Sequence, residues 1–496
     1  MRIVETHQTE LGNLPIADIK FDLKSRDDIP QLLRGLQFIY LNDELKRKVF
    51  ELLEKHIQAD RDHNNGRPGM NLWSILVMGV LRLDLNWDYD RLQEQVNHHR
   101  TIRQMLGHAD FFDTQEYALQ TLKDNVRLLS PELLDEINQI VVTGGHALVK
   151  KKEPEKLRGR CDSFVVETHV HYPTDINILF DAMRKVMTLT AKQCEANQIP
   201  GWRQHRYHIR QIKKSQRIAQ LTKRGGGKTD EAKIKKQSKI IEAHQHYIDL
   251  SQVHLTRANQ SLKTLTNIGL VNLTDNLQLL EIEQYIQDAE RQIDQITRRV
   301  IQGDTIPHSE KVFSIFQRHT EWIVKGKAGI NQELGLRVCI MEDQYQFILH
   351  HQVMEKQTDD QVAVSMVSET QSRFKAFSTC SFDKGYHSPD NQEKLKEMLD
   401  TVALPRKGKR SKKVQALEST DEYRQAHDKH SAVESAINAL EVHGLDRCPD
   451  HGIEGFKRYV ALSVVARNLQ RIGAILTDKA RKDFARQERK RLKQAA

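Results

Sequence analysis

The sequence predicts a multidomain α/β protein, in which a helical N-terminal region precedes an α/β core that a long helical insertion divides. Three observations lead to this fold class. The chain has 496 residues, more than one ordinary hydrophobic core occupies. Charged residues make up 29% and hydrophobic residues 38%, which is typical of folded chains with a solvated surface. The spacing of apolar residues also changes along the chain from helical to strand-like and back.

Residues 1–150 are expected to form a helical N-terminal domain, because apolar residues recur at helical spacing from Asn42 to about Leu148. A turn is predicted at 65–69. Three short helices are expected beyond it, at Met70–Leu83, Tyr89–Val96 and Thr101–Leu106. This arrangement is compatible equally with a helix-turn-helix module and with a plain helical bundle.

The α/β core is expected in two pieces, residues 151–175 and 306–477. After a charged stretch at 150–154, β-branched residues predict a strand from Gly159 to Thr168. A β-hairpin, a helix with a capping box, a strand, a helix, a strand and a long final helix are expected in the second piece. Their ranges are Leu334–Met341 with Tyr345–Val353, Asp359–Phe374, Phe377–Phe382, Asn391–Leu399, Thr401–Leu404 and Thr420–Gly444. This order fits a ribonuclease-H-like fold of the retroviral-integrase type.

Residues 176–305 are expected to form a polar, basic helical insertion with a loop at Gly225–Gly227. Trp202–Ile240 contains thirteen Lys or Arg and two acidic residues, and this one-sided excess favours DNA contact over a merely solvated face. Residues 478–496 are expected to form a basic tail. A net charge of +9 and a pI near 9.1 also indicate a polyanionic partner.

Two other classes of protein are disfavoured. No apolar run approaches the roughly 20 residues that span a bilayer, and the N-terminus lacks the pattern of a signal peptide. We therefore expect no membrane partner and a cytoplasmic location. The five cysteines are scattered and form no Cys-x-x-Cys pair, so the sequence suggests neither a disulfide framework nor a zinc site.

Three acidic residues stand where this fold could bring them together: Asp162 on the first strand, Asp383 after a later strand, and Glu434 in the final helix. Transfer of a phosphodiester suits two divalent ions about 4 Å apart. Such hard cations prefer carboxylate oxygens. Spacing alone carries little weight, however, because the chain has 67 acidic residues.

Local motifs strengthen this interpretation. Cys161–Ser163, Val165–Glu167 and His171–Asp175 closely resemble the first-aspartate block of insertion-sequence DDE transposases, nearest to the ISNCY-like group. Residues 30 to 110 resemble the N-terminal domain common among these enzymes. Four later segments resemble the later blocks of the family: Glu321–Lys327, Phe382–Pro389, Ser431–Ser435 and His443–Arg447.

The resemblance implies that Asp162, Asp383 and Glu434 are catalytic and ligate Mg²⁺ or Mn²⁺, with two ions in the site. It implies cleavage of double-stranded DNA at terminal inverted repeats, followed by transfer of the exposed 3′-hydroxyl to target DNA. A homodimer on the DNA and association with the bacterial nucleoid are also implied.

Further residues are expected around this triad. Helical spacing places His427, His430, Asn438 and Glu441 near the face of Glu434. We expect His430 and Asn438 to contact the substrate or the metal ligands, whereas Glu441 is the alternative third ligand. Related transposases have Tyr, Arg and Lys at the positions of His427, His430 and Glu441. The phosphate contacts that this Arg and Lys usually make must therefore come from other residues of this chain, or from protonated histidine.

Basic residues near the expected active site are candidates for DNA contact, and they are Lys325, Lys327, Lys384, Arg406, Lys407, Lys409 and Arg410. Trp322 and Tyr386 either stack on an exposed base or pack in the core. Three other functions remain: a domesticated, catalytically silent DNA-binding protein, a ribonuclease-H-like host nuclease, and a helical scaffold.

Overall fold

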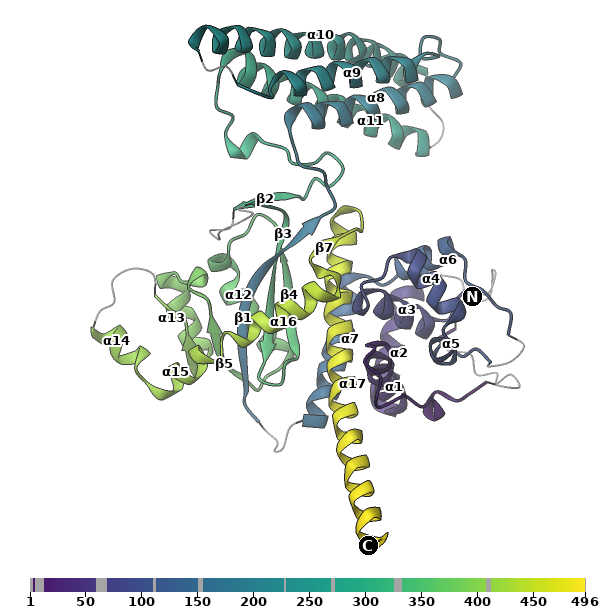
Figure 1. The fold of residues 1–496 in the computed structure, drawn as a ribbon, viewed down its shortest axis with the longest axis vertical. Helices are drawn as coiled ribbons and strands as arrows, with labels where there is room; N and C mark the ends of the chain where they lie inside the picture. Colours follow the sequence, from purple (N-terminus) through teal and green to yellow (C-terminus); the bar gives the residue numbers. More distant parts are fainter. Residues whose placement is uncertain are drawn as a thin grey trace. The chain divides into compact units, whose positions relative to one another are not determined.

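A computed structural model describes residues 3–4, 13–58, 69–109, 113–149, 155–226, 229–268, 273–324, 332–406 and 412–495. The chain forms two compact units (Figure 1). One unit is Val170–Trp322, the helical insertion with short flanking segments. The other unit contains both the N-terminal helices and the α/β core. The expected turn at 65–68 and the charged stretch at 150–154 lie outside the described residues.

The N-terminal region is helical, as the apolar spacing predicts. Its helices are α1 (Ile29–Leu41), α2 (Asp43–Gln58), α3 (Leu72–Asp84), α4 (Tyr89–His98), α5 (Arg100–Met105), α6 (Leu119–Val126) and α7 (Pro131–Val149), after a short 3₁₀ turn, η1 (Ile16–Asp18). The three expected short helices are therefore present as α3, α4 and α5. Helix α1 was not expected, although Pro30 stands at its start and Leu32, Leu33 and Leu36 are buried.

The core contains a mixed sheet. Its strands are β1 (Leu157–Thr168), β2 (Glu321–Val324), β3 (Gln332–Asp343), β4 (Ile348–Met354), β5 (Phe377–Phe382), β6 (Thr401–Ala403) and β7 (Arg447–Cys448). β3 pairs antiparallel with both β4 and β1. On its other side β1 pairs parallel with β5, and β5 pairs parallel with β6. The order β4-β3-β1-β5-β6 therefore joins an antiparallel half to a parallel half.

The connections follow the sequence signals closely. The predicted hairpin is present as β3 and β4. Helix α12 (Asp359–Arg373) begins with the predicted capping box, in which Thr358 and Gln361 satisfy each other's backbone groups. β5 and α13 (Pro389–Met398) also lie where they were expected. Helix α14 (Lys412–Glu418), in contrast, was not expected.

The prediction of one continuous helix from Thr420 to Gly444 is wrong. The segment consists of α15 (Asp421–Asp428), α16 (Ala432–Leu440) and a π-helical turn, η5 (Glu441–Leu445). Tight turns interrupt the helix after Asp428, where the His430 N–H donates to the His427 carbonyl. The ends match the prediction: Thr420 caps α15, and Gly444 has a left-handed backbone with φ of 98°.

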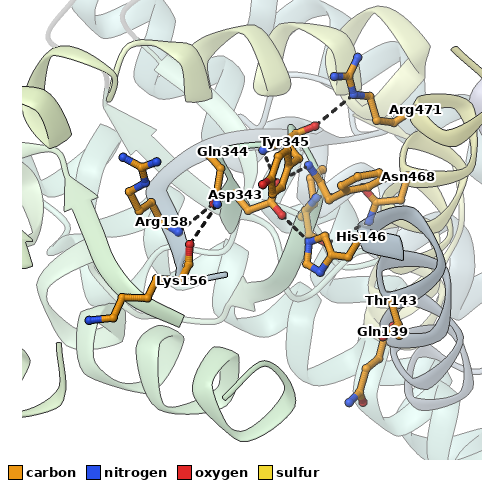
Figure 2. A network of polar contacts seen from close by, with 12 residues as sticks. Gln139, Thr143, His146, Lys156, Arg158, Asp343, Gln344, Tyr345, Asn468 and Arg471 are labelled. Atoms are coloured by element: carbon orange, nitrogen blue, oxygen red, sulfur yellow. Dashed lines mark hydrogen bonds and ion pairs between the residues drawn. The ribbon is translucent and has the colours of Figure 1, made fainter. Parts of the chain in front are cut away.

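Helix α17 (Gly452–Ala495) ties the N-terminal helices to the sheet. It packs against α1, α3, α7 and β4, and Figure 1 shows it running beside α7. Figure 2 shows the polar contacts at this junction, centred on the turn between β3 and β4. The fully buried Asp343 accepts a 2.6 Å hydrogen bond from His146 of α7, and Arg471 of α17 donates to the Tyr345 carbonyl. Asn468 donates to the Ile348 carbonyl and accepts from the Ile348 N–H.

The insertion unit has its own hydrophobic core. Its elements are α8 (Asp175–Ala196), α9 (His205–Thr222), α10 (Asp230–Ile268), α11 (Leu273–Ile296), the π-helical η2 (Thr297–Gln302) and the 3₁₀ turn η3 (His308–Glu310). Buried Tyr247 of α10 donates to the Ile176 carbonyl of α8. The predicted loop lies between α9 and α10, with Gly225 at a φ of 76°. Among the described residues, no helix is both long and apolar enough to cross a membrane.

Candidate active site

Asp162 and Asp383 lie at the same edge of the sheet. The parallel pairing of β1 with β5 ends at Cys161 opposite Phe382, so each aspartate directly follows one member of this last pair. Neighbouring strands are about 4.8 Å apart, which brings the two backbone positions close together. Asp162 is partly buried and accepts a 2.8 Å hydrogen bond from the Ser163 N–H. Asp383 is exposed, and its carboxylate accepts from the Gly385 N–H at 3.5 Å.

Glu434 lies on a helix, not on a strand of the sheet. It lies exposed in the first turn of α16, and α16 packs against β1. The pKa of Asp162 is raised to about 6, chiefly by burial and then by the charges of Asp383, Asp359 and Glu434, against the opposing Ser163 hydrogen bond. Asp383 and Glu434 are therefore near enough to act electrostatically on Asp162.

Asp359, the first residue of α12, belongs to the same group of charges and was not expected from the sequence. Its carboxylate accepts a 2.6 Å hydrogen bond from the Ser163 hydroxyl. The only sequence signal was its place next to Thr358 at the start of a capped helix. An acidic residue there is ordinary, because the helix dipole favours negative charge in the first turn.

His430 lies beside the triad, as expected, but not for the expected reason. It stands in the turn before α16, so helical spacing does not place it, or His427, on the face of Glu434. His430 is instead positioned by a contact with β5, because its Nδ1 is 3.1 Å from the Ser381 hydroxyl. Burial lowers the pKa of His430, although Asp383 and Glu434 act in the opposite direction. A neutral imidazole is favoured, so this side chain is poorly suited to contact a phosphate as an arginine would.

Asn438 is exposed on α16 one turn after Glu434, which agrees with its expected position. Glu441 stands at the end of the same helix, two turns from Glu434, and begins η5. Of these two glutamates, Glu434 is the one whose charge raises the pKa of Asp162. This contribution favours Glu434 as the third carboxylate.

The expected DNA-contacting residues are only partly described. Lys384 is exposed directly after Asp383, and Arg406 is exposed beside a cavity of about 220 Å³ that Tyr423 also lines. Lys325, Lys327, Lys407, Lys409 and Arg410 lie outside the described residues.

Base stacking by Tyr386 is contradicted. The ring is 1% exposed, and its hydroxyl lies 3.2 Å from the Cys339 sulfur inside the core. Trp322 is partly buried in the insertion unit, where its ring contacts those of Tyr172 and Phe313. Both aromatic residues thus pack against other side chains of the protein, which was the second of the two expected roles.

Comparison with protein-family models, curated proteins and solved structures found no match. Function is therefore inferred from the side chains themselves.

The carboxylates fit a divalent metal in their chemistry. Asp162, Asp383 and Glu434 are hard oxygen donors, which Mg²⁺ and Mn²⁺ prefer. In the described part of the chain, no three His, Cys, Asp or Glu side chains are grouped as a ready-made metal site. Asp383 and Glu434 are exposed, whereas Asp162 is partly buried. The five cysteines are free and buried.

Proposed function

We propose that this chain is a DDE-type transposase that cuts DNA at the ends of an insertion sequence and joins the resulting 3′-hydroxyl to target DNA. One observation carries the proposal. Asp162, Asp383 and Glu434 are far apart in the sequence, yet Asp162 and Asp383 follow paired residues of β1 and β5, and Glu434 lies on α16, which packs against β1. These are also the residues that match the acidic positions of the transposase motifs.

The sheet supports a ribonuclease-H-like assignment for the core. The chain order β1, β3, β4, α12, β5, α13, β6 agrees with the order of elements expected from the sequence, and β1 and β5 are parallel. Asp162 lies on β1, and Asp383 directly follows β5, the strand that pairs parallel with β1.

Asp162, Asp383 and Glu434 are the residues that would hold Mg²⁺ or Mn²⁺. When bound, such ions neutralise phosphate charge and lower the pKa of a water molecule. Asp162 is held by its strand and by the Ser163 N–H, whereas Asp383 and Glu434 are exposed and able to adjust to a substrate. His430 remains a candidate for positioning Asp383, since the carboxylate charge acts on its imidazole.

The insertion unit offers a surface for the DNA backbone. Arg206, Arg210, Lys214 and Arg217 are exposed and recur three or four residues apart along α9, which places them on one face of the helix. The opposite face is buried, with Ile212 and Ala219 in the core of the unit. A row of cations on a rigid helix suits contact with successive phosphates.

The experiment is strand transfer with DNA that carries the terminal repeats, supplied either intact or pre-cut. Wild-type protein is expected to cut intact ends and join pre-cut ends only with Mg²⁺ or Mn²⁺. Cutting without joining would instead identify a host nuclease, and DNA binding without either reaction a silent derivative. Because both ends are processed together, a dimer is expected when the protein is sized with end DNA. A transposase of this kind would act on the nucleoid in the bacterial cytoplasm.

A further inference from the structure

Asp359 lies between the two segments that carry the candidate catalytic aspartates. On one side its Oδ1 accepts a 2.6 Å hydrogen bond from the Ser163 hydroxyl, and Ser163 directly follows Asp162. On the other side its Oδ2 would lie 3.0 Å from a Cβ added to Gly385, which stands two residues after Asp383. One carboxylate therefore hydrogen-bonds to β1 and lies close to η4 (Lys384–Tyr386), against which α12 packs.

Ser163 and Gly385 each donate a backbone hydrogen bond to a candidate catalytic carboxylate. The Ser163 N–H donates to Asp162 Oδ1 at 2.8 Å, and the Gly385 N–H donates to Asp383 Oδ2 at 3.5 Å. Movement of Ser163 or Gly385 would consequently change the orientation of Asp162 or Asp383. Asp359 lies next to the donor residue of each of these two hydrogen bonds.

The start of α12 is held firmly against η4. The Asn391 side-chain amide donates to the Asp360 carbonyl at 2.6 Å and to the Tyr386 carbonyl at 2.9 Å. Tyr386 is itself anchored in the core beside Cys339. The backbone of Asp359 is thus fixed relative to both aspartate-bearing segments.

Helix capping does not account for the Asp359 side chain. Thr358 and Gln361 supply the capping box of α12, so the Asp359 carboxylate is not needed to satisfy the free N–H groups of the first turn. That carboxylate points instead to Ser163, on a strand that is 196 residues away in the chain.

We propose that Asp359 is a positioning residue for the reaction proposed above: it orients Asp162 through Ser163 and, because it lies close to Gly385, limits the positions open to the Asp383 segment. This inference rests on the proposed transposase activity. Groups that orient metal ligands through a hydrogen bond contribute roughly 10- to 100-fold in metal affinity or activity when they are removed. The loss of Asp359 is expected to fall in that range.

The test uses the full chain and compares Asp359→Ala, Ser163→Ala and the double variant with wild type. Asp360→Asn is the matched control, because this neighbouring carboxylate instead accepts from the Thr358 hydroxyl within its own turn. DNA cleavage is measured against Mg²⁺ concentration and against DNA concentration, and Mn²⁺ binding to the DNA-free protein is measured by calorimetry. The calorimetric readout does not depend on turnover.

We expect Asp359→Ala to lower kcat and Mn²⁺ affinity by roughly 10- to 100-fold with little change in KM for DNA. Ser163→Ala should show part of this loss, and the double variant no more than Asp359→Ala, because the two residues act through one contact. Wild-type kcat and Mn²⁺ affinity in Asp359→Ala, or equal losses in Asp360→Asn, would overturn the positioning role. If wild type binds Mn²⁺ but cuts no DNA, the proposed function fails, and weaker Mn²⁺ binding by Asp359→Ala still supports the positioning role.

Discussion

Replacement of Asp162 by Asn is expected to stabilise the protein at neutral pH while abolishing catalysis. The pKa of Asp162 is raised from 3.8 to about 6, chiefly by burial and then by neighbouring carboxylates. A carboxyl with a raised pKa binds its proton more tightly in the folded protein. Its contribution to stability is therefore complete below pH 3.8 and is lost as the pH rises to about 6. Asn cannot ionise, and its amide oxygen can still accept from the Ser163 N–H.

The magnitude follows from the same pKa. At 1.36 kcal/mol per pKa unit, the difference corresponds to about 3 kcal/mol at pH 8 and about half of that at pH 5. Hydrogen exchange in peptides from β1 and β5, measured against urea concentration, reports the unfolding free energy of the unit that contains Asp162. The exposed Asp478→Asn variant is the control, and it should match wild type at both pH values.

Mg²⁺ should narrow this difference in stability. A metal bound only by the folded protein adds about 1.4 kcal/mol at ten times its Kd. Wild type should gain this stability at pH 8, whereas Asp162→Asn should gain almost none. Equal stabilities of wild type and Asp162→Asn from pH 5 to pH 8, with equal responses to Mg²⁺, would refute the view that Asp162 lies in a carboxylate cluster.

Three further predictions concern other parts of the chain. Changing both Arg210 and Lys214 of α9 to Gln should weaken binding to any DNA sequence and reduce the slope of log affinity against log salt by about two, which fluorescence anisotropy would detect; an unchanged slope would remove α9 from the DNA interface. Arg82→Met should destabilise the fold by about 1–3 kcal/mol in urea denaturation, because it removes the 2.8 Å partner of the largely buried Asp450 and leaves that carboxylate its 3.3 Å ion pair with Arg458; unchanged stability would contradict this. Burial raises the pKa of Asp84 far above its ordinary value, and both of its carboxylate oxygens lack a hydrogen-bond partner. The wild-type protein therefore loses stability as the pH rises above that ordinary value, and Asp84→Asn should be more stable than wild type at pH 8 by about 1–3 kcal/mol, with the gap closing towards pH 4 in hydrogen-exchange measurements.

Much of the core could be predicted because its signals are local. β5 was expected at Phe377–Phe382 and has these bounds, since a short apolar run ends at a charged turn. The capping box of α12 is likewise a local pattern of two residues. Asp162 and Asp383 could be placed at the sheet edge because each stands in or directly after such a strand.

Features that depend on tertiary contacts could not be predicted. The polar, helix-compatible pattern after Thr420 continues through Lys429, so it hides the break between α15 and α16. His430 contacts Ser381, which lies 49 residues earlier in the chain. Asp359 lies in the site because it accepts a hydrogen bond from Ser163, and no spacing rule connects residues so distant in sequence.

The central claim is tested most directly by Mg²⁺-dependent cleavage of end DNA by Asp162→Asn, Asp383→Asn, Glu434→Gln and Glu441→Gln beside wild type. The account predicts that wild type and Glu441→Gln cut, whereas the other three variants bind the DNA but do not cut it. Cleavage by Glu434→Gln together with an inactive Glu441→Gln, or the same activity in all five proteins, would contradict it.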